Sequence, residues 1–220
     1  MTSPALSNRS IATAALAGLA TFPAIVVALH IVQRGDYHPV SEAVSELALG
    51  RAGWLMWIAF CGVGTGLICL GILHRRLVER SRTAPVLLAI AGLLADVSAV
   101  FHADPESATT TSLHDEIHQI ASLLAFVSVI IAMFISSRRF RVDRRWQRLA
   151  RPTLVWAICA VAALLLTLAL DNSNFFGLGQ RIFILTWLTW SIAASAHART
   201  IATDSRAAVE RSEAVPAQAG

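Results

Sequence analysis

The chain has 220 residues, of which 55% are hydrophobic and only 15% charged, and its mean hydropathy is +0.61. These values lie outside the usual range of a soluble domain and indicate an integral membrane protein. All 18 basic residues are arginines that cluster between apolar runs, so the net charge of +4 is a topology signal and argues against nucleic acid as a partner. The three cysteines lack CxxC or Cys/His spacing and predict neither a disulfide framework nor a thiolate metal site.

Six apolar runs follow one another along the chain. Each has about 18 to 25 residues, which is enough to cross a hydrocarbon core of roughly 30 Å as a helix. The fold class that we expect is therefore all-α, a bundle of six transmembrane helices within residues 1–198. The predicted helices lie near 10–32, 53–73, 84–101, 117–137, 152–170 and 176–196. Residues 199–220 lack apolar periodicity and predict a disordered cytoplasmic tail.

The arginines alternate from one connection to the next. Segments 74–83 and 138–151 carry four and seven arginines with one acid each, whereas 34–52 carries two arginines with three acids, and 102–116 carries four acids and no arginine. The positive-inside rule then predicts that both termini are cytoplasmic, and that 34–52, 102–116 and 171–175 lie outside. We expect a multi-pass protein of the bacterial inner membrane, with the lipid bilayer as its surroundings.

The first outer connection contains "SEAVSELALG", whose apolar residues fall on one side of a helix. This pattern predicts a short surface helix with Ser41 as its N-cap and Gly50 as its stop.

Titratable residues gather at the predicted outer boundary, and the segment "HDEIH" is the most distinctive part of this set. His114 and His118 are four residues apart, so on a helix both imidazoles project to one side. Asp104, from "FHADP", and the nearby His102 are candidates to join them, which gives a tentative metal site for Zn²⁺ or Fe²⁺. Glu116 stands two residues after the first histidine, where a standard zinc peptidase does not have its glutamate.

Two other interpretations of the histidines stay open. They can act without metal, as acid/base groups or as a proton relay, with Asp104, His114, His118 and Glu116 as catalytic residues. They can also cap the fourth helix and bind nothing. Ser45 is a candidate nucleophile only if a histidine reaches it, since loop serines more often cap helices.

Four further residues are candidates for substrate binding: Tyr37, Glu42, Asp96 and Arg181. Asp96 lies within the third apolar run, where an acid should face protein or water rather than lipid. Arg181 starts the last run without a neighbouring arginine, and we expect it to form a salt bridge with an outer acid or to hold an anionic headgroup.

The segments "DYHPVSEAVSELALGRAGWL", "FHADP", "SLHDEIHQIASLLAF" and "GLGQRIF" together resemble the bacterial domain-of-unknown-function 998 family. The resemblance spans most of residues 30–190 and implies an integral membrane protein of about six helices with a shared outer cluster. It implies no reaction. Asp115 stands where glycine is usual in the family's His-Gly-x-x-His element, which is a departure from the pattern.

Three functions are consistent with these observations. The first is a membrane-embedded hydrolase or lipid-modifying enzyme that acts on a lipid or other amphiphilic substrate. The second is a small proton-coupled transporter that uses Asp96 and the histidines as a relay, although the sequence shows no inverted repeat. The third is a non-catalytic membrane scaffold. The sequence leaves the substrate and the oligomeric state open.

Overall fold

The computed structural model describes residues 7–105, 108–171 and 173–214, with side chains up to 204. This part of the chain is all-α: it contains six α-helices, one short 3₁₀ helix and no strand longer than an isolated bridge between Arg34 and Tyr37. The helices are α1 (Asn8–Val32), η1 (Val44–Ala48), α2 (Leu55–Leu77), α3 (Thr83–Val100), α4 (Leu113–Val142), α5 (Gln147–Ala169) and α6 (Phe176–Ala214).

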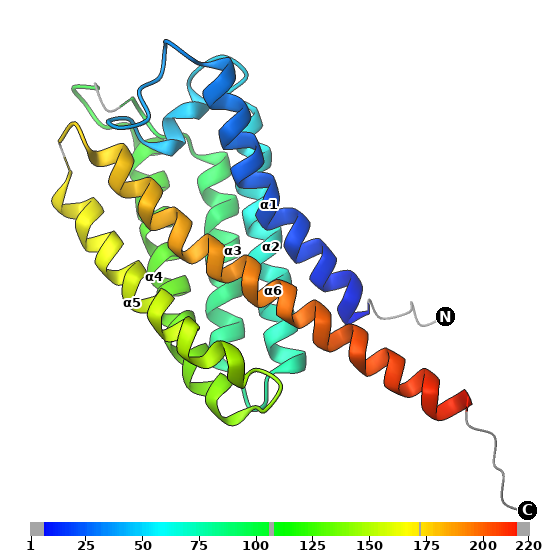
Figure 1. Cartoon of the computed structure of the whole chain (residues 1–220). Coiled ribbons are helices and arrows are strands. Elements are labelled where there is room, and N and C mark those ends of the chain that lie inside the picture. The colour runs from blue at the N-terminus through cyan, green and yellow to red at the C-terminus, as the bar shows by residue number, and fades with distance from the viewer. Residues whose placement is uncertain (1–6, 106–107, 172, 215–220) are drawn as a thin grey trace, which may run out of the picture.

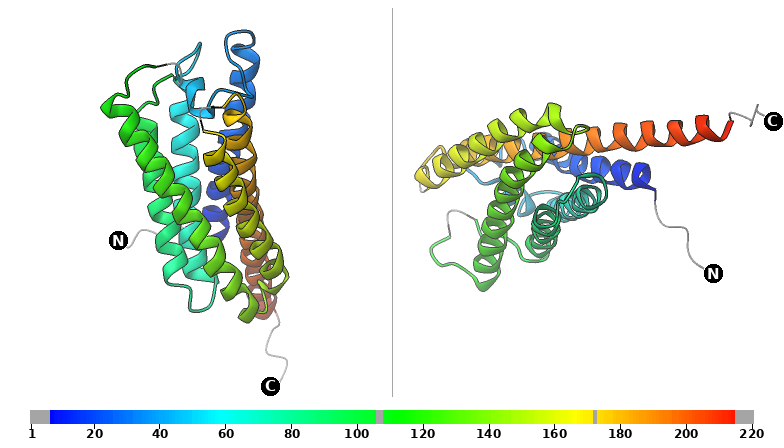
Figure 2. Two further views of the ribbon diagram at one scale, coloured as in Figure 1. Left: turned by 90° about the vertical axis from the view of Figure 1, so that its left-hand side faces the viewer. Right: turned by 90° about the horizontal axis from the view of Figure 1, so that it is seen from below.

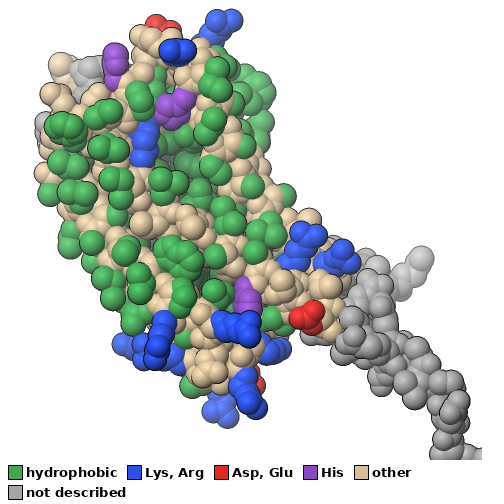
Figure 3. Space-filling view, in the orientation of Figure 1, with side chains coloured by type: hydrophobic (Ala, Val, Ile, Leu, Met, Phe, Trp, Pro, Cys, Tyr) green, Lys and Arg blue, Asp and Glu red, His purple; other side chains and the backbone are tan. Residues whose placement is uncertain are grey.

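The six long helices follow one another around a bundle, and α6 returns to pack against α1 (Figure 1). Because each helix reverses direction, three connections lie at one end of the ring, and two connections lie at the other end with the start of α1 and the end of α6. We call the end with connections 33–54, 101–112 and 170–175 the polar end, and the end with connections 78–82 and 143–146 the arginine end. On the face shown in Figure 3, hydrophobic side chains form a broad band between the two ends, and most of the arginines gather at one of them.

Five of these helices, α1 to α5, are long and apolar enough to cross a membrane. The chain is therefore a multi-pass integral membrane protein. The sixth helix, α6, is longer but less apolar on average, since it carries polar residues at both ends. That all six helices span, and that the termini are cytoplasmic, remain predictions.

Glycines let α2 approach its neighbours on two sides. Gly18 of α1 lies against Gly62 and Gly66 of α2, and a Cβ at Gly66 would come within 2.7 Å of the Leu19 side chain. On its other side, α2 presents Gly64 to Gly92 of α3, where a Cβ at Gly92 would lie 2.6 Å from the Gly64 carbonyl oxygen. Small residues of this kind permit the close backbone contact on which helix association in a membrane depends.

At the arginine end, a hydrogen-bond network joins the two connections. The carboxylate of Asp143 accepts bonds from the backbone N–H groups of Glu79 (3.2 Å) and Arg145 (3.0 Å) and forms an ion pair with the Arg145 guanidinium at 3.1 Å. Burial of Asp143 opposes its ionisation, but the bonds from Arg145 and Glu79 outweigh this effect and lower its pKa. Arg145 and Trp146 also donate to the Leu77 carbonyl oxygen, at 2.7 and 3.2 Å. These hydrogen bonds hold the connection 143–146 against the end of α2 and the connection 78–82.

At the polar end, α4 and α5 stand apart. The helices lie close together at their connection 143–146 and diverge toward the polar end in both views of Figure 2.

The helices extend past the predicted apolar runs where capping and charged residues continue the helical turn. Helix α4 begins at Leu113 rather than near 117, because the Ser112 hydroxyl accepts the Asp115 N–H at 3.2 Å as an N-cap. Helix α6 continues to Ala214, so the expectation of a disordered tail is wrong for residues 199–214, where alanine, arginine and glutamate favour a helix. Residues 215–220 lie outside the described residues.

The short surface helix is present as η1, but its expected cap is wrong. It begins at Val44 after Ala43, and the Glu46 carboxylate accepts the Ala43 N–H at 3.0 Å. Ser41 instead lies in the preceding turn, where its carbonyl oxygen accepts the Gly177 N–H at 3.2 Å. The helix ends at Ala48, before Gly50 is reached.

Candidate functional site

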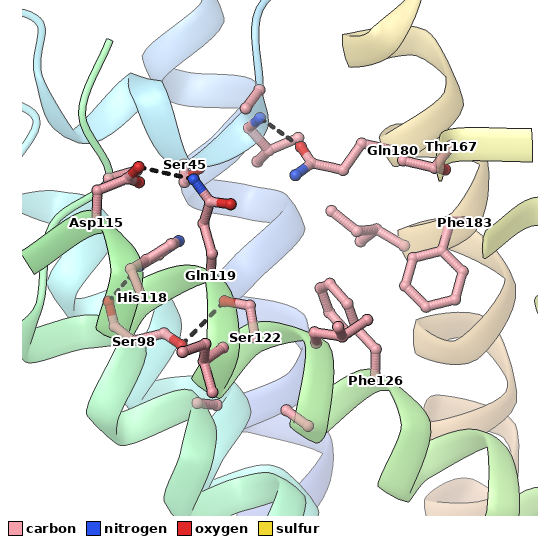
Figure 4. Close-up of a pocket in the computed structure, with 18 of the residues that line it drawn as sticks. Ser45, Ser98, Asp115, His118, Gln119, Ser122, Phe126, Thr167, Gln180 and Phe183 are labelled. Carbon is pink, nitrogen blue, oxygen red and sulfur yellow. Dashed lines mark hydrogen bonds between the residues drawn. The ribbon is translucent and has the colours of Figure 1, made fainter. Parts of the chain in front are cut away.

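A cavity of about 640 Å³ occupies the polar half of the bundle, between η1 and helices α2 to α6 (Figure 4). Its deep part is apolar, with Phe60 and Leu67 of α2, Ala91 of α3 and Phe126 of α4 among its walls. Its mouth is polar. The titratable and amide side chains that line it are Glu46, Asp104, Asp115, His118, Gln119, Asp171 and Gln180.

The cavity is open between α4 and α5. Its lining includes Ile120 and Leu123 of α4, which are 60% and 44% exposed, and Leu168 of α5, which is 55% exposed. These apolar side chains lie on the rim, at the height where the two helices diverge.

The first turn of α4 places the mouth carboxylates. Asp104 accepts hydrogen bonds from the Ser112 N–H (2.6 Å) and the Ser112 hydroxyl (3.0 Å), and Ser112 in turn caps the helix. Asp115 then lies in the first turn, where the helix dipole favours a negative charge. The Gln119 amide donates to the Asp115 carboxylate at 2.7 Å, so the carboxylate is held at the cavity wall.

Helix η1 closes the top of the cavity beside α6. Gln180 of α6 accepts a hydrogen bond of 2.7 Å from the Val44 N–H, and two further bonds join the loop backbone to α6, from Gly177 to Ser41 and from Leu178 to Val40. Ser45, which is 8% exposed, lines the cavity from this helix.

His118 is buried in the cavity wall with a defined orientation. Its Nδ1 lies 2.9 Å from the Phe101 carbonyl oxygen and 3.1 Å from that of Ser98. A carbonyl oxygen only accepts, so Nδ1 must carry the proton, and in the neutral ring Nε2 is then an acceptor. The second ring nitrogen points away from these carbonyls toward the cavity (Figure 4), while Phe60 packs edge-on against the ring at 5.8 Å.

The structure separates the two histidines of "HDEIH". His114 is exposed and packs against Phe101 at 5.2 Å and against His102 at 6.2 Å, outside the cavity lining. Glu116 is also exposed and is not part of the cavity lining. The residue that shares the cavity with His118 is Asp115.

The tentative metal set is therefore not assembled. Among the described residues, no three His, Cys, Asp or Glu side chains are grouped closely enough to hold an ion. The physical reason is that His118 and Asp104 line the cavity, whereas His114 and His102 lie outside its lining and pack against each other. Both oxygens of Asp104 also accept hydrogen bonds from Ser112. Nor does a hydrogen bond join Ser45 to a histidine within the described chain, although Ser45 and His118 line one cavity.

Three of the expected substrate-binding residues form a separate cluster beside the cavity. The guanidinium of Arg181 donates to the carbonyl oxygens of Gly177 (2.8 Å) and Glu42 (3.0 Å), to the Tyr37 hydroxyl, and contacts Nε2 of His30 at 3.3 Å. In the described residues Arg181 makes no ion pair with a carboxylate, so the expected salt bridge is wrong: carbonyl and phenol oxygens take its place. The Glu42 carboxylate instead accepts the His38 N–H at 3.1 Å.

The Tyr37 hydroxyl joins Arg181 to the backbone of the first connection. It donates toward the carbonyl oxygens of Ala43 (2.8 Å) and Glu42 (3.1 Å). Burial of the phenol raises its pKa to about 12, even though the charge of Arg181 opposes the shift. The cluster holds connection 33–54 against α6 and so positions η1, but it does not line the cavity.

Asp96 also lies outside the cavity lining. Its carboxylate sits against Gly64 of α2, where a side chain at Gly64 would collide with it. The missing side chain at Gly64 thus leaves room for the Asp96 carboxylate at the α2–α3 contact.

Several cavity residues were missed from the sequence: Ser98, Gln119, Ser122 and Trp187. The spacing of residues along α4 could have indicated this face of the cavity. On α4 the lining residues recur at three- and four-residue steps, as Asp115, His118, Ser122, Phe126 and Val129 do, and a helical face that changes from polar to apolar along its length is typical of a binding cleft.

Comparisons with known proteins agree with this architecture. The family model described as "Protein of unknown function (DUF998)" matches residues 15–197, which include helices α2 to α5, most of α1, the first half of α6 and the cavity lining. No curated protein and no solved structure matches the chain. The chain belongs to the DUF998 family.

Proposed function

We propose that this membrane protein binds a single-chain amphiphile, which enters from the lipid between α4 and α5. The observation that carries the proposal is the cavity itself, with an apolar interior, a polar mouth and a rim of exposed apolar side chains. Its volume of about 640 Å³ falls in the range of small-molecule sites, roughly 300 to 1,000 Å³. Under the predicted topology, the ligand would come from the outer leaflet.

The charge of the mouth favours one class of headgroup. The cavity lining that the structure describes contains four carboxylates, those of Glu46, Asp104, Asp115 and Asp171, and no arginine. Arg181, in the first turns of α6, donates to carbonyl and phenol oxygens and lies outside the cavity lining. Electrostatic complementarity therefore favours a cationic amine or a neutral, hydroxyl-rich headgroup over a phosphate or carboxylate.

Binding can be measured with three dodecyl probes that differ only in the headgroup: dodecylamine, 1-monododecanoylglycerol and dodecyl phosphate. The protein in lipid nanodiscs should bind the amine and the glycerol ester more tightly than the phosphate. Ala125→Phe fills the cavity wall and should weaken binding at least tenfold, whereas Ala162→Phe, on the exposed face of α5, should not. The proposal fails if no probe binds, or if Ala125→Phe binds like the wild type.

The orientation of His118 favours a second candidate, hydrolysis of an ester or amide in the bound amphiphile. Nε2 would accept a proton from a water molecule, whose oxygen adds to the carbonyl carbon. The same proton would then pass to the leaving alcohol or amine as the carbonyl–heteroatom bond breaks. A general base needs an unprotonated Nε2, and within the neutral ring the carbonyls at Nδ1 select the tautomer that has it.

Release of dodecanoate from 1-monododecanoylglycerol or from an N-dodecanoyl amine tests this candidate. His118→Gln should abolish the release while the probe still binds, and His114→Gln, outside the cavity, should leave the rate within about twofold of the wild type. If the wild type binds these probes but releases no dodecanoate, the hydrolase is ruled out for them and the binding function stands.

A further inference from the structure

Two aspartates are buried in the part of the chain that the structure describes, and their surroundings differ. Asp143, which is 3% exposed, forms an ion pair with Arg145 at the arginine end. Asp115, which is 6% exposed, forms no ion pair with any described residue, and its carboxylate accepts a hydrogen bond only from the neutral amide of Gln119. A buried carboxylate without a cation is unfavourable, so a cation is expected beside Asp115.

The chain does not bring a cation to this position. All of its basic residues are arginines, and none of the described residues that line the cavity is an arginine. His118, three residues along α4 from Asp115, lines the same cavity, but in the described chain no hydrogen bond or ion pair joins the two side chains. The counter-charge is therefore expected from a ligand.

One oxygen of the Asp115 carboxylate is open to such a ligand. Gln119 donates to Oδ2 at 2.7 Å, and Figure 4 shows the carboxylate directed toward this amide at the cavity wall. The other oxygen, Oδ1, has no partner in the described chain and keeps accessible surface, so it is open to the cavity that Asp115 lines.

His118 provides a second acceptor on the same face of α4. Its Nε2 also has no partner in the described chain, keeps accessible surface and points toward the cavity (Figure 4). Residues three apart on a helix have Cβ atoms about 5 to 6 Å from each other, so Asp115 and His118 are neighbours at the mouth. One ligand nitrogen that carries two or more N–H groups can donate to both.

We propose that Asp115 and His118 form an ammonium subsite, in which the headgroup nitrogen of the amphiphile donates one N–H to Oδ1 of Asp115 and another to Nε2 of His118. The ligand class is thereby narrowed to primary and secondary amines, because a tertiary ammonium has a single N–H and a quaternary ammonium has none. The subsite rests on the proposed function, since it assumes that an amphiphile occupies the cavity. The role of Nε2 here and its role as a general base are alternatives, because its one lone pair accepts one proton donor at a time.

The test uses dodecylamine and its N-methyl, N,N-dimethyl and N,N,N-trimethyl derivatives, which are all cationic at neutral pH, with the protein in lipid nanodiscs. Dodecylamine and the N-methyl derivative should bind within about twofold of each other, because both keep two N–H groups. Affinity should fall about tenfold with the second methyl group and about tenfold again with the third, since each removes one charge-assisted hydrogen bond.

Three variants assign the two acceptors. Asp115→Asn keeps the shape of the side chain without its charge and should weaken the binding of dodecylamine at least tenfold, while 1-monododecanoylglycerol, which has no charge, should bind within about twofold of the wild type. His118→Phe should remove the loss at the second methyl group and keep the loss at the third. Glu116→Gln is the matched control, because it removes a carboxylate one residue away, outside the cavity lining, and should bind dodecylamine within about twofold of the wild type.

The wild-type series decides the matter even where a variant fails to fold. If dodecylamine binds but its affinity does not change with methylation, or falls with the first methyl group, the ammonium subsite is overturned while the cavity function stands. The same holds if Asp115→Asn binds 1-monododecanoylglycerol and also binds dodecylamine like the wild type. If neither dodecylamine nor 1-monododecanoylglycerol binds the wild type, the proposed function itself is contradicted, and the subsite with it.

Discussion

Gln180 on α6 accepts a 2.7 Å hydrogen bond from the backbone N–H of Val44, which is 136 residues earlier in the chain. This bond attaches η1 to the bundle at the mouth of the cavity. A side chain from one wall thus holds the backbone of the helix that closes the site.

Replacement of Gln180 by leucine should leave the Val44 N–H without its acceptor and lower the free energy of unfolding by about 1 to 3 kcal/mol. Amide hydrogen exchange at residues 44–46 should become faster. Gln119→Leu is the control, because Gln119 bonds to Asp115 on its own helix and should leave exchange in η1 unchanged. Equal exchange rates in the wild type and Gln180→Leu would contradict the role of this bond.

The second prediction concerns the tautomer of His118. Its Nδ1 faces two carbonyl oxygens, so ¹⁵N NMR at neutral pH should show the Nδ1–H form, with the signal assigned by its loss in His118→Gln. His197 provides the opposite case within the same spectrum, because its Nε2 lies 2.7 Å from the Arg145 carbonyl oxygen and should carry the proton. Observation of Nε2–H at His118 would remove the general base from the hydrolase proposal.

The third prediction concerns alkaline pH. Tyr37 is the one tyrosine, so phenolate absorbance reports this residue alone. The chain has no lysine, so no lysine titrates in the same pH range. The folded pKa is about 12 against about 10 in the unfolded chain, so the native state holds the proton more tightly. Stability should be unaffected below pH 10 and should fall between pH 10 and 12, by on the order of 2 kcal/mol.

Tyr37→Phe is the control for this window. It should be less stable at neutral pH, because Arg181 and the loop carbonyls lose the hydroxyl, and its stability should change less between pH 10 and 12. A phenolate signal that appears near pH 10 in the folded protein would show that Tyr37 is not buried in this way.

The fourth prediction concerns the arginine end. The lowered pKa of Asp143 means that its contribution to stability is present above the unfolded value of about 4 and is lost as pH falls through the folded pKa. Asp143→Asn should cost about 1 to 3 kcal/mol at neutral pH, a modest figure because Arg145 is 48% exposed. Thermal unfolding measured from pH 7 to pH 3 should show a smaller acid-induced loss in the variant than in the wild type.

The sequence predicted the helices because a hydrophobic run long enough to cross a bilayer has few alternatives. Its errors fell where local polar interactions decide the boundary. Ser112 extends α4 outward, and helix-favouring residues carry α6 beyond 198. The preference of alanine and arginine for helix is not visible in an analysis of apolar periodicity.

The site was harder to predict, since spacing along one helix does not reveal what lies opposite. His114 and His118 share a side of α4 in a helical projection. However, His118 is buried in the cavity wall, where it bonds to the carbonyl oxygens of Ser98 and Phe101, whereas His114 is exposed. Arg181 was expected to need a carboxylate, but folding brings the carbonyl oxygen of Glu42 to it instead. These hydrogen-bond acceptors are backbone carbonyl oxygens, which every residue type has, so the composition of the chain cannot predict which of them will lie beside a given side chain.

The network around Asp143 gives the α4–α5 pair a fixed pivot. Helix α5 has 23 residues and is about 34 Å long, so a tilt of roughly 5° about the connection 143–146 would move its far end by about 3 Å. A displacement of that size is comparable to the thickness of an alkyl chain. A small tilt at the arginine end, where the Asp143 carboxylate holds the connection, would therefore change the width of the opening between α4 and α5 at the polar end.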